Sequence, residues 1–110
     1  MTDVIIQKTV KLADIEKIDI HGKLWNDVHA NTYHSVQVSV LLKGDDKYTD
    51  LGFIAFRYGY DNCYEQSALM VLEKSVAGWN PKEKAIHWIA SELGLEIDSR
   101  KEWVKRKRDL

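Results

Sequence analysis

The chain has 110 residues, of which 45% are hydrophobic and 30% are charged, with a single proline and a single cysteine. This length and apolar content predict one domain with its own core, and they exclude a disordered chain. The lone Cys63 excludes an internal disulfide, and the first residues lack the features of a signal peptide, so we expect a reducing cytoplasm. No apolar run approaches the roughly 20 residues of a membrane span, so we expect no membrane partner.

The charge is unevenly distributed, although the formal net charge is only −1. Residues 100–110 contain six Lys and Arg residues against two acids, a net charge of +4, which leaves −5 on residues 1–99. An acidic body with a basic end is typical of a protein with a polyanionic partner, and it is also compatible with ordinary solubility. We therefore expect a single domain over residues 1–99, followed by a basic tail over residues 100–110.

The first third of the chain predicts two strands. Residues 4–12 are rich in β-branched side chains, and Val4, Ile6, Val10 and Leu12 share one face that Lys8 interrupts. Residues 17–21 alternate in the same way and precede Gly22, which predicts a short second strand ending there. Residues 24–28 fit neither a strand nor a helix clearly.

The clearest strand covers residues 35–42, where Val36, Val38 and Val40 share one face with Leu42. It ends at the turn residues 44–46. Residues 51–58 are apolar on both faces as far as Arg57, which predicts a central strand joined to the preceding one as a hairpin.

Two helix starts follow. Asn62 precedes Glu65 with the capping-box spacing, and Gly78 marks the predicted end of this helix. Asn80, Pro81 and Glu83 form the strongest start signal of the chain. The apolar stripe of the first helix consists of Tyr64, Ala68, Leu69, Leu72 and Val76, and that of the second of Ile86, Ile89, Ala90 and Leu93.

Gly94 has the pattern of a left-handed stop, and residues 95–97 are compatible with a further strand. Together these elements predict an α+β fold, an antiparallel sheet of three to four strands with two consecutive helices packed on one face. The expected core consists of Val36, Val38, Val40, Leu69, Leu72, Ile86, Ile89 and Leu93.

No enzyme class is favoured by the motifs. The four histidines and Cys63 match no zinc spacing, so we expect no metal and no other cofactor. No glycine-rich phosphate cradle is present, and no nucleophile, base and orienting group can be named together. We therefore expect a non-catalytic protein.

Aromatic residues are concentrated in the middle of the chain. Phe53 and Phe56 have opposite parity on one strand, so at most one of them is expected to point outward. The element Asn31-Thr32-Tyr33-His34-Ser35 carries five hydrogen-bonding side chains and allows two interpretations. In one, these side chains close a turn and anchor the strand, so that Tyr33 or His34 is needed for stability. In the other, Tyr33 and His34 form a ligand surface with Tyr58 and Tyr60.

The basic tail has the composition of an arm that contacts phosphates, because it combines cations with one large aromatic ring. The alternative is an ordinary solvated terminus. The candidate nucleic-acid-binding residues are Arg100, Lys101, Trp103, Lys105, Arg106, Lys107 and Arg108.

Three segments carry a resemblance to a known group of proteins. Residues 31–36 (Asn-Thr-Tyr-His-Ser-Val), the Tyr58-Gly59-Tyr60-Asp61 turn with the following Tyr64-Glu65-Gln66, and residues 104–110 stand in an order that resembles a family of small bacteriophage and prophage proteins. Ala30 stands where that family usually has glycine. The resemblance implies a phage origin and the host cytoplasm, and it implies no particular reaction.

Two functions remain open. The chain is expected either to bind nucleic acid through its basic arm and exposed aromatic residues, or to bind and modulate a host protein through its acidic body. Small phage proteins with the second role are known as a class, which makes that alternative an analogy at family level.

Overall fold

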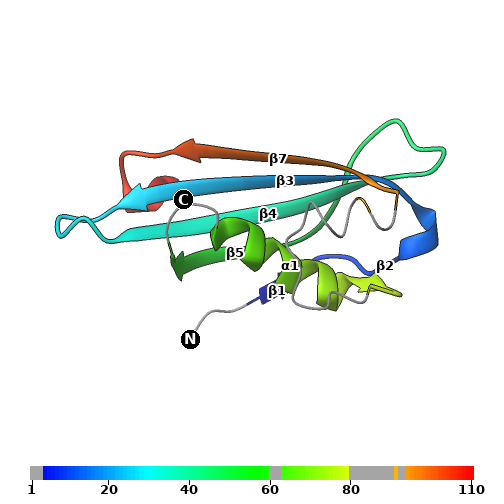
Figure 1. Cartoon of the computed structure of the whole chain (residues 1–110), viewed down its shortest axis with the longest axis horizontal. Helices are drawn as coiled ribbons and strands as arrows, with labels where there is room; N and C mark the ends of the chain where they lie inside the picture. The colour runs from blue at the N-terminus through cyan, green and yellow to red at the C-terminus, as the bar shows by residue number, and fades with distance from the viewer. Residues whose placement is uncertain (1–3, 60–62, 80–90, 92–93) are drawn as a thin grey trace.

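The computed structural model describes residues 4–59, 63–79, 91 and 94–110. Its main feature is a five-stranded sheet with the strand order β1-β5-β4-β3-β7, covered on one face by the helix α1 (Figure 1). The elements are β1 Val4–Ile6, β2 Val10–Lys11, the 3₁₀ turn η1 Leu12–Asp14, β3 Ile15–Asn26, β4 Thr32–Leu42, β5 Thr49–Tyr58, α1 Cys63–Ser75, β6 Val76–Ala77, β7 Glu96–Trp103 and the 3₁₀ turn η2 Lys107–Asp109.

The predicted fold class is wrong, because the sheet is mixed and has five strands. β3, β4, β5 and β1 pair antiparallel, whereas β7 runs parallel to β3. In the described part of the chain a single α-helix covers the sheet. The second helix, predicted from Asn80, and its core residues Ile86, Ile89 and Leu93 lie outside the described residues.

The charged strand β7 explains much of this error. Five of its eight residues, Glu96–Trp103, are charged, a composition typical of a solvated tail. As an edge strand, however, β7 has a neighbour on one side only, and charged side chains are tolerated there. The boundary expected at residue 100 consequently falls inside a strand of the sheet.

Ion pairs across β3 and β7 match the parallel register. On one face of the sheet, Lys17 lies 2.9 Å from Asp98, Arg100 lies 3.1 Å from Asp19, and His21 lies 2.8 Å from Glu102. The hydrogen bond to Asp98 raises the pKa of Lys17 above its ordinary value, against the opposing effect of partial burial. Two ion pairs and one histidine–carboxylate contact therefore join the two strands along their length.

The long β3–β4–β5 meander provides the frame of the molecule. β3 continues through Gly22, where a strand end was expected. The Tyr64 ring of α1 packs directly over this residue, since a Cβ atom at Gly22 would lie 2.4 Å from Tyr64 Cδ2. The predicted β4–β5 hairpin is confirmed. The expected strand over residues 4–12 is divided into β1 and β2, because the backbone N–H groups of Gln7 and Lys8 both donate hydrogen bonds to the Leu51 carbonyl.

The core lies between the sheet and α1, whose predicted start after Asn62 is confirmed; Asn62 itself lies outside the described residues. The helix ends at Ser75, before the predicted end at Gly78, and Val76 of its predicted apolar stripe lies in β6. The expected Val36, Val38, Val40 and Leu72 are buried, whereas Leu69 is only half-buried, since the helix turns Val71 toward the sheet. Other fully buried side chains are Ile18, Ile20, Leu24, Leu51 and Ile54. No described helix is long and apolar enough to cross a membrane.

Candidate functional site

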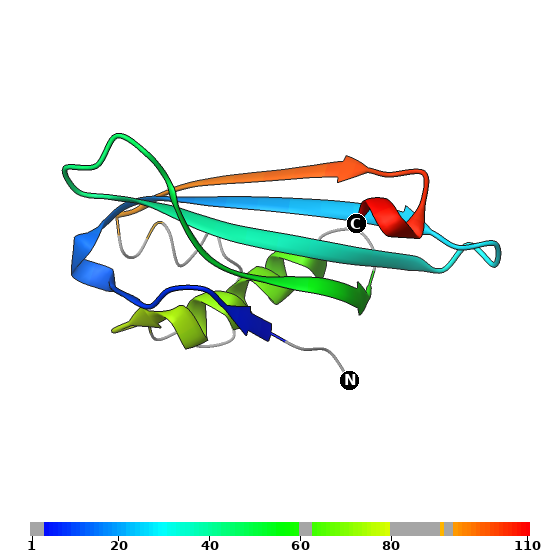
Figure 2. The same cartoon turned by 180° about the vertical axis from the view of Figure 1, so that it is seen from behind.

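The sheet face opposite α1 carries polar side chains and the C-terminal segment, residues 104–110. Figure 1 shows α1 in front of the sheet, and Figure 2, from behind, shows η2 in front of β3 and β4. Strand alternation places Asp19, His21 and Lys23 of β3 on this face, together with Ser35 and Gln37 of β4. We call it the open face.

Four aromatic rings meet at the end of the open face near the β3–β4 turn. The Tyr33 ring lies 4.8 Å from Phe56 in a stacked arrangement, 5.5 Å from Tyr58 edge-on, and 5.8 Å from Trp25 (centroid distances). We call these four residues the aromatic patch. Tyr58 is 59% exposed and Phe56 38%, so the patch is accessible at its β5 side.

A β-bulge in β5 builds this patch. Gln37 pairs with Phe53 and Tyr33 with Tyr58, so five residues of β4 face six of β5, and the extra residue is accommodated opposite Ser35. The bulge shifts the parity of the strand, and both Phe53 and Phe56 lie on the open face. The expectation that at most one of them points outward is therefore wrong.

The basic segment lies against the aromatic patch. The Lys107 Nζ atom is 4.7 Å from the centroid of the Phe56 ring, a cation–π distance. Lys105, Arg106 and Arg108 line a shallow hollow of about 650 Å³ with Lys23, Glu102 and Asp109. We call it the basic hollow.

The predicted nucleic-acid-binding residues are divided between two faces. Lys105, Arg106, Lys107 and Arg108 lie in the segment that crosses the open face. Arg100 shares this face, and its guanidinium group is paired with Asp19. Ser99, Lys101 and Trp103 alternate along β7 and therefore point to the same side of the sheet. Because Ser99 hydrogen-bonds Tyr64 of α1, this is the helix side.

His34 is not part of a ligand surface, because its side chain is only 1% exposed. Its Nδ1 atom lies 3.0 Å from the Gly59 carbonyl oxygen, and its Nε2 atom lies 2.7 Å from Ser67 Oγ. Arg57 Nη1 donates a hydrogen bond to the same hydroxyl at 3.0 Å. His34 faces the helix because it alternates with Tyr33, so a ligand surface containing both side chains is excluded by strand geometry.

The contact between His34 and Ser67 has the length of a nucleophile–base pair. Ser67 is 0% exposed, however, and α1 covers the pair, so no substrate atom reaches the hydroxyl in this arrangement. Burial lowers the pKa of His34, the hydrogen bond to the Gly59 carbonyl opposes this, and the charge of Arg57 lowers it further. His34 is therefore a neutral residue that anchors β4 to the helix.

Asp27 closes the turn before β4. Its Oδ1 atom accepts hydrogen bonds from the backbone N–H groups of His29 and Asn31, at 2.8 and 2.9 Å. Partial burial acts to raise the pKa of the Asp27 carboxyl, but these hydrogen bonds outweigh it and the pKa is lowered. Thr32 donates its hydroxyl to Asn26 at 2.6 Å. Asn31 and Thr32 thus have the structural role that was one of the two expectations.

Tyr60 and Cys63 were also considered from the sequence. Tyr60 lies outside the described residues. Cys63 is half-buried at the start of α1, and among the described residues no three side chains are grouped as a metal site would require. The sequence did not indicate Trp25, Lys23 or Phe53 as site residues. Lys23 lies at every second position along β3 with Asp19 and His21, and this alternation could have placed its side chain on the open face.

Comparison with protein-family models, with curated proteins and with solved structures gave no match. The resemblance to small phage proteins therefore stays a prediction that rests on the three segments described above.

Proposed function

We propose that the open face binds single-stranded nucleic acid, with the aromatic patch stacking bases and the basic segment contacting phosphates. Bases are accessible for stacking only when they are unpaired, which favours single strands over duplexes. The proposed role is that of a non-catalytic accessory protein, acting in the host cytoplasm if the chain is of phage origin.

The proposal is supported mainly by the contact between Lys107 and Phe56, 4.7 Å from ammonium to ring centroid. It brings two features together that are far apart in the sequence, a run of cations and a cluster of rings. Proteins that bind single strands combine a positive groove with aromatic side chains in this way. The basic hollow adds further donors, because Lys105, Arg106 and Arg108 form no ion pair among the described residues.

This proposal is tested by measuring the affinity for a fluorescein-labelled oligothymidylate of about 16 nucleotides, which is the upper site size of a small single-strand-binding fold. Affinity should fall with salt, with a logarithmic slope of about −3, because each of roughly four phosphate contacts contributes about −0.7. A duplex of the same length should bind more weakly.

Matched variants test whether oligonucleotide binding depends on the aromatic patch and on the cations of the basic segment. Tyr58→Ala should weaken binding about tenfold, since stacking contributes ~1–3 kcal/mol per base. Tyr48→Ala, also exposed but in the loop at the opposite end of β4 and β5, should not. Likewise Lys105→Gln with Arg106→Gln should reduce the salt slope, whereas Lys43→Gln with Lys47→Gln in that loop should leave it unchanged.

Absence of oligonucleotide binding at low salt would contradict the proposal. It would favour the alternative, recognition of a host protein through the acidic body, whose exposed acids include Asp45, Asp46 and Asp50 at the loop end of the molecule.

A further inference from the structure

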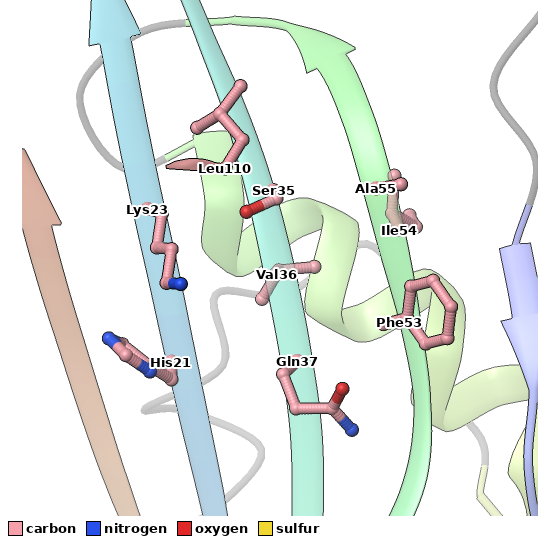
Figure 3. A pocket seen from close by; sticks show the side chains of 9 residues that line it. All are labelled: His21, Lys23, Ser35, Val36, Gln37, Phe53, Ile54, Ala55 and Leu110. Carbon is pink, nitrogen blue, oxygen red and sulfur yellow. The ribbon is translucent and has the colours of Figure 1, made fainter. Parts of the chain in front are cut away.

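Two hollows adjoin on the open face and share two of their lining residues. The first, of about 210 Å³, is lined mainly by His21, Lys23, Ser35, Gln37, Phe53 and Leu110 (Figure 3). We call it the phenyl hollow. Lys23 and Leu110 also line the basic hollow, so the two spaces meet at these side chains.

The phenyl hollow combines a ring with hydrogen-bonding groups. Figure 3 shows the Phe53 ring on one side, His21 and Lys23 on the other, and the Gln37 amide extending toward Phe53. Gln37 Nε2 donates to the Gly52 carbonyl and to Gln7 Oε1, each at 3.1 Å, which holds the amide in place. No described residue donates a hydrogen bond to Gln37 Oε1, so this acceptor is available to a ligand.

The size and chemistry of the phenyl hollow limit its ligand. At about 210 Å³ it is smaller than the roughly 300–1,000 Å³ of sites for drug-sized molecules, so it accommodates one small ring system. The phenyl ring of Phe53 favours a planar group, and the lysine, serine, histidine and glutamine side chains favour one with several polar atoms. A nucleobase has both properties.

The basic hollow indicates that the ligand also carries a negatively charged group. Its cations are Lys23, Lys105, Arg106 and Arg108, against the acids Glu102 and Asp109. Glu102 is already paired with His21 at 2.8 Å. Arginine side chains are suited to the oxygens of a phosphate group, and Lys23 stands where the two hollows meet.

We infer that the paired hollows bind one phosphorylated nucleoside, with its base against Phe53 in the phenyl hollow and its phosphate in the basic hollow beside Lys23. This inference rests on the proposed function and deepens it, because it assigns a defined nucleotide position next to the aromatic patch. The same chemistry is found in a free nucleotide and in the phosphorylated end of a strand.

Isothermal titration of the full chain tests the site with adenosine 5′-monophosphate, adenosine and inorganic phosphate. The monophosphate should bind at least about tenfold more tightly than either part alone, because charge-assisted hydrogen bonds to phosphate add to the contacts of the base. Phe53→Leu and Lys23→Gln should each weaken its binding, and Lys47→Gln should not. Ser35→Leu, which adds side-chain volume inside the phenyl hollow, gives a second variant should Phe53→Leu fail to fold.

Oligothymidylates with a 5′-phosphate, a 3′-phosphate or neither distinguish the two sources. Tighter binding of one phosphorylated end, abolished by Lys23→Gln, assigns the site to a strand end. Tight binding of the monophosphate with no preference among the oligonucleotides assigns it to a free nucleotide.

The outcomes for the two proposals are separable. If the unphosphorylated oligonucleotide binds in a Tyr58-dependent way but the monophosphate does not bind and terminal phosphates have no effect, the paired-hollow site is wrong and the proposed function stands. Equal binding of the monophosphate by wild type, Phe53→Leu and Ser35→Leu would also overturn the site.

Discussion

At the scale of single residues, His34 shows how a polar side chain becomes part of a core. Both ring nitrogens have partners, the Gly59 carbonyl and the Ser67 hydroxyl, although these lie 25 and 33 residues away in sequence. The tautomer with hydrogen on Nδ1 satisfies both, because this nitrogen donates to the carbonyl and Nε2 accepts from the hydroxyl.

His34→Ala should reduce the free energy of unfolding by more than about 1 kcal/mol, because it removes the ring from a buried site and leaves the Gly59 carbonyl without its donor. Urea unfolding followed by circular dichroism measures this. Tyr33→Ala should also destabilise, through the loss of three ring contacts. Wild-type melting of His34→Ala would contradict the structural role of this side chain.

His34 should also make stability depend on pH. Its pKa in the folded protein is lowered, mainly by burial, so the unfolded state binds the proton more readily. Stability should therefore be complete above about pH 6.5, the ordinary histidine value, and should decline as pH falls below it. His34→Gln should flatten the dependence of the urea midpoint on pH in this range. His29→Gln, at an exposed turn position, should leave it in place, and an unchanged profile in His34→Gln would contradict the assignment.

Ala30 has a backbone φ of 64°, in the left-handed region that favours glycine. Ala30→Gly should therefore raise the free energy of unfolding by about 0.5–1 kcal/mol, since it relieves this strain at an exposed turn. Ala13→Gly, an exposed residue without positive φ, is the control and should not stabilise.

At the scale of elements, the contact between β3 and α1 depends on one missing side chain. A Cβ atom at Gly22 would lie 2.4 Å from Tyr64 Cδ2 and 2.6 Å from Tyr64 Cγ. These atoms are near the base of a buried side chain, so the helix as a whole would have to move. The helix therefore approaches the sheet most closely where β3 has no side chain.

Gly22→Ala should destabilise the fold by about 1–3 kcal/mol, the usual cost of overpacking. Thermal or urea unfolding measures the loss. The double variant with Tyr64→Leu should lose less than the sum of the two single variants, because the shorter side chain relieves the clash. Strict additivity would show that the two residues are not in contact.

At the scale of the whole molecule, the boundary between domain and tail lies after Trp103 and not before Arg100. Residues 100–103 pair with residues 21–24 of β3, and Val104 donates its backbone N–H to the Leu24 carbonyl at 2.8 Å. Only the segment that follows crosses the open face.

Two truncations distinguish these boundaries. A chain ending at residue 103 should keep a cooperative unfolding transition and lose the salt-dependent part of oligonucleotide binding. A chain ending at residue 99 should lose at least about 2 kcal/mol in addition, because several backbone hydrogen bonds, the Arg100–Asp19 ion pair and the His21–Glu102 contact disappear. Equal stability of the two truncated chains would contradict the pairing of β7.

Local patterns in the sequence determined the β4–β5 hairpin, the helix that follows Asn62 and the left-handed backbone at Gly94, whose φ is 67°. These features follow from interactions between residues near one another in the chain, such as apolar alternation, capping and glycine conformation. The concentration of cations in residues 100–110 was likewise evident from composition alone.

Only the tertiary structure decided the parallel pairing of β7, the burial of His34 and the meeting of Lys107 with Phe56. Each depends on a contact between distant segments, and the bulge in β5 shows why parity arguments fail there: one extra residue turns every later side chain to the opposite face. The candidate site consists of such contacts, which form because the cation-rich segment folds back over the sheet and lies against rings brought together by three strands.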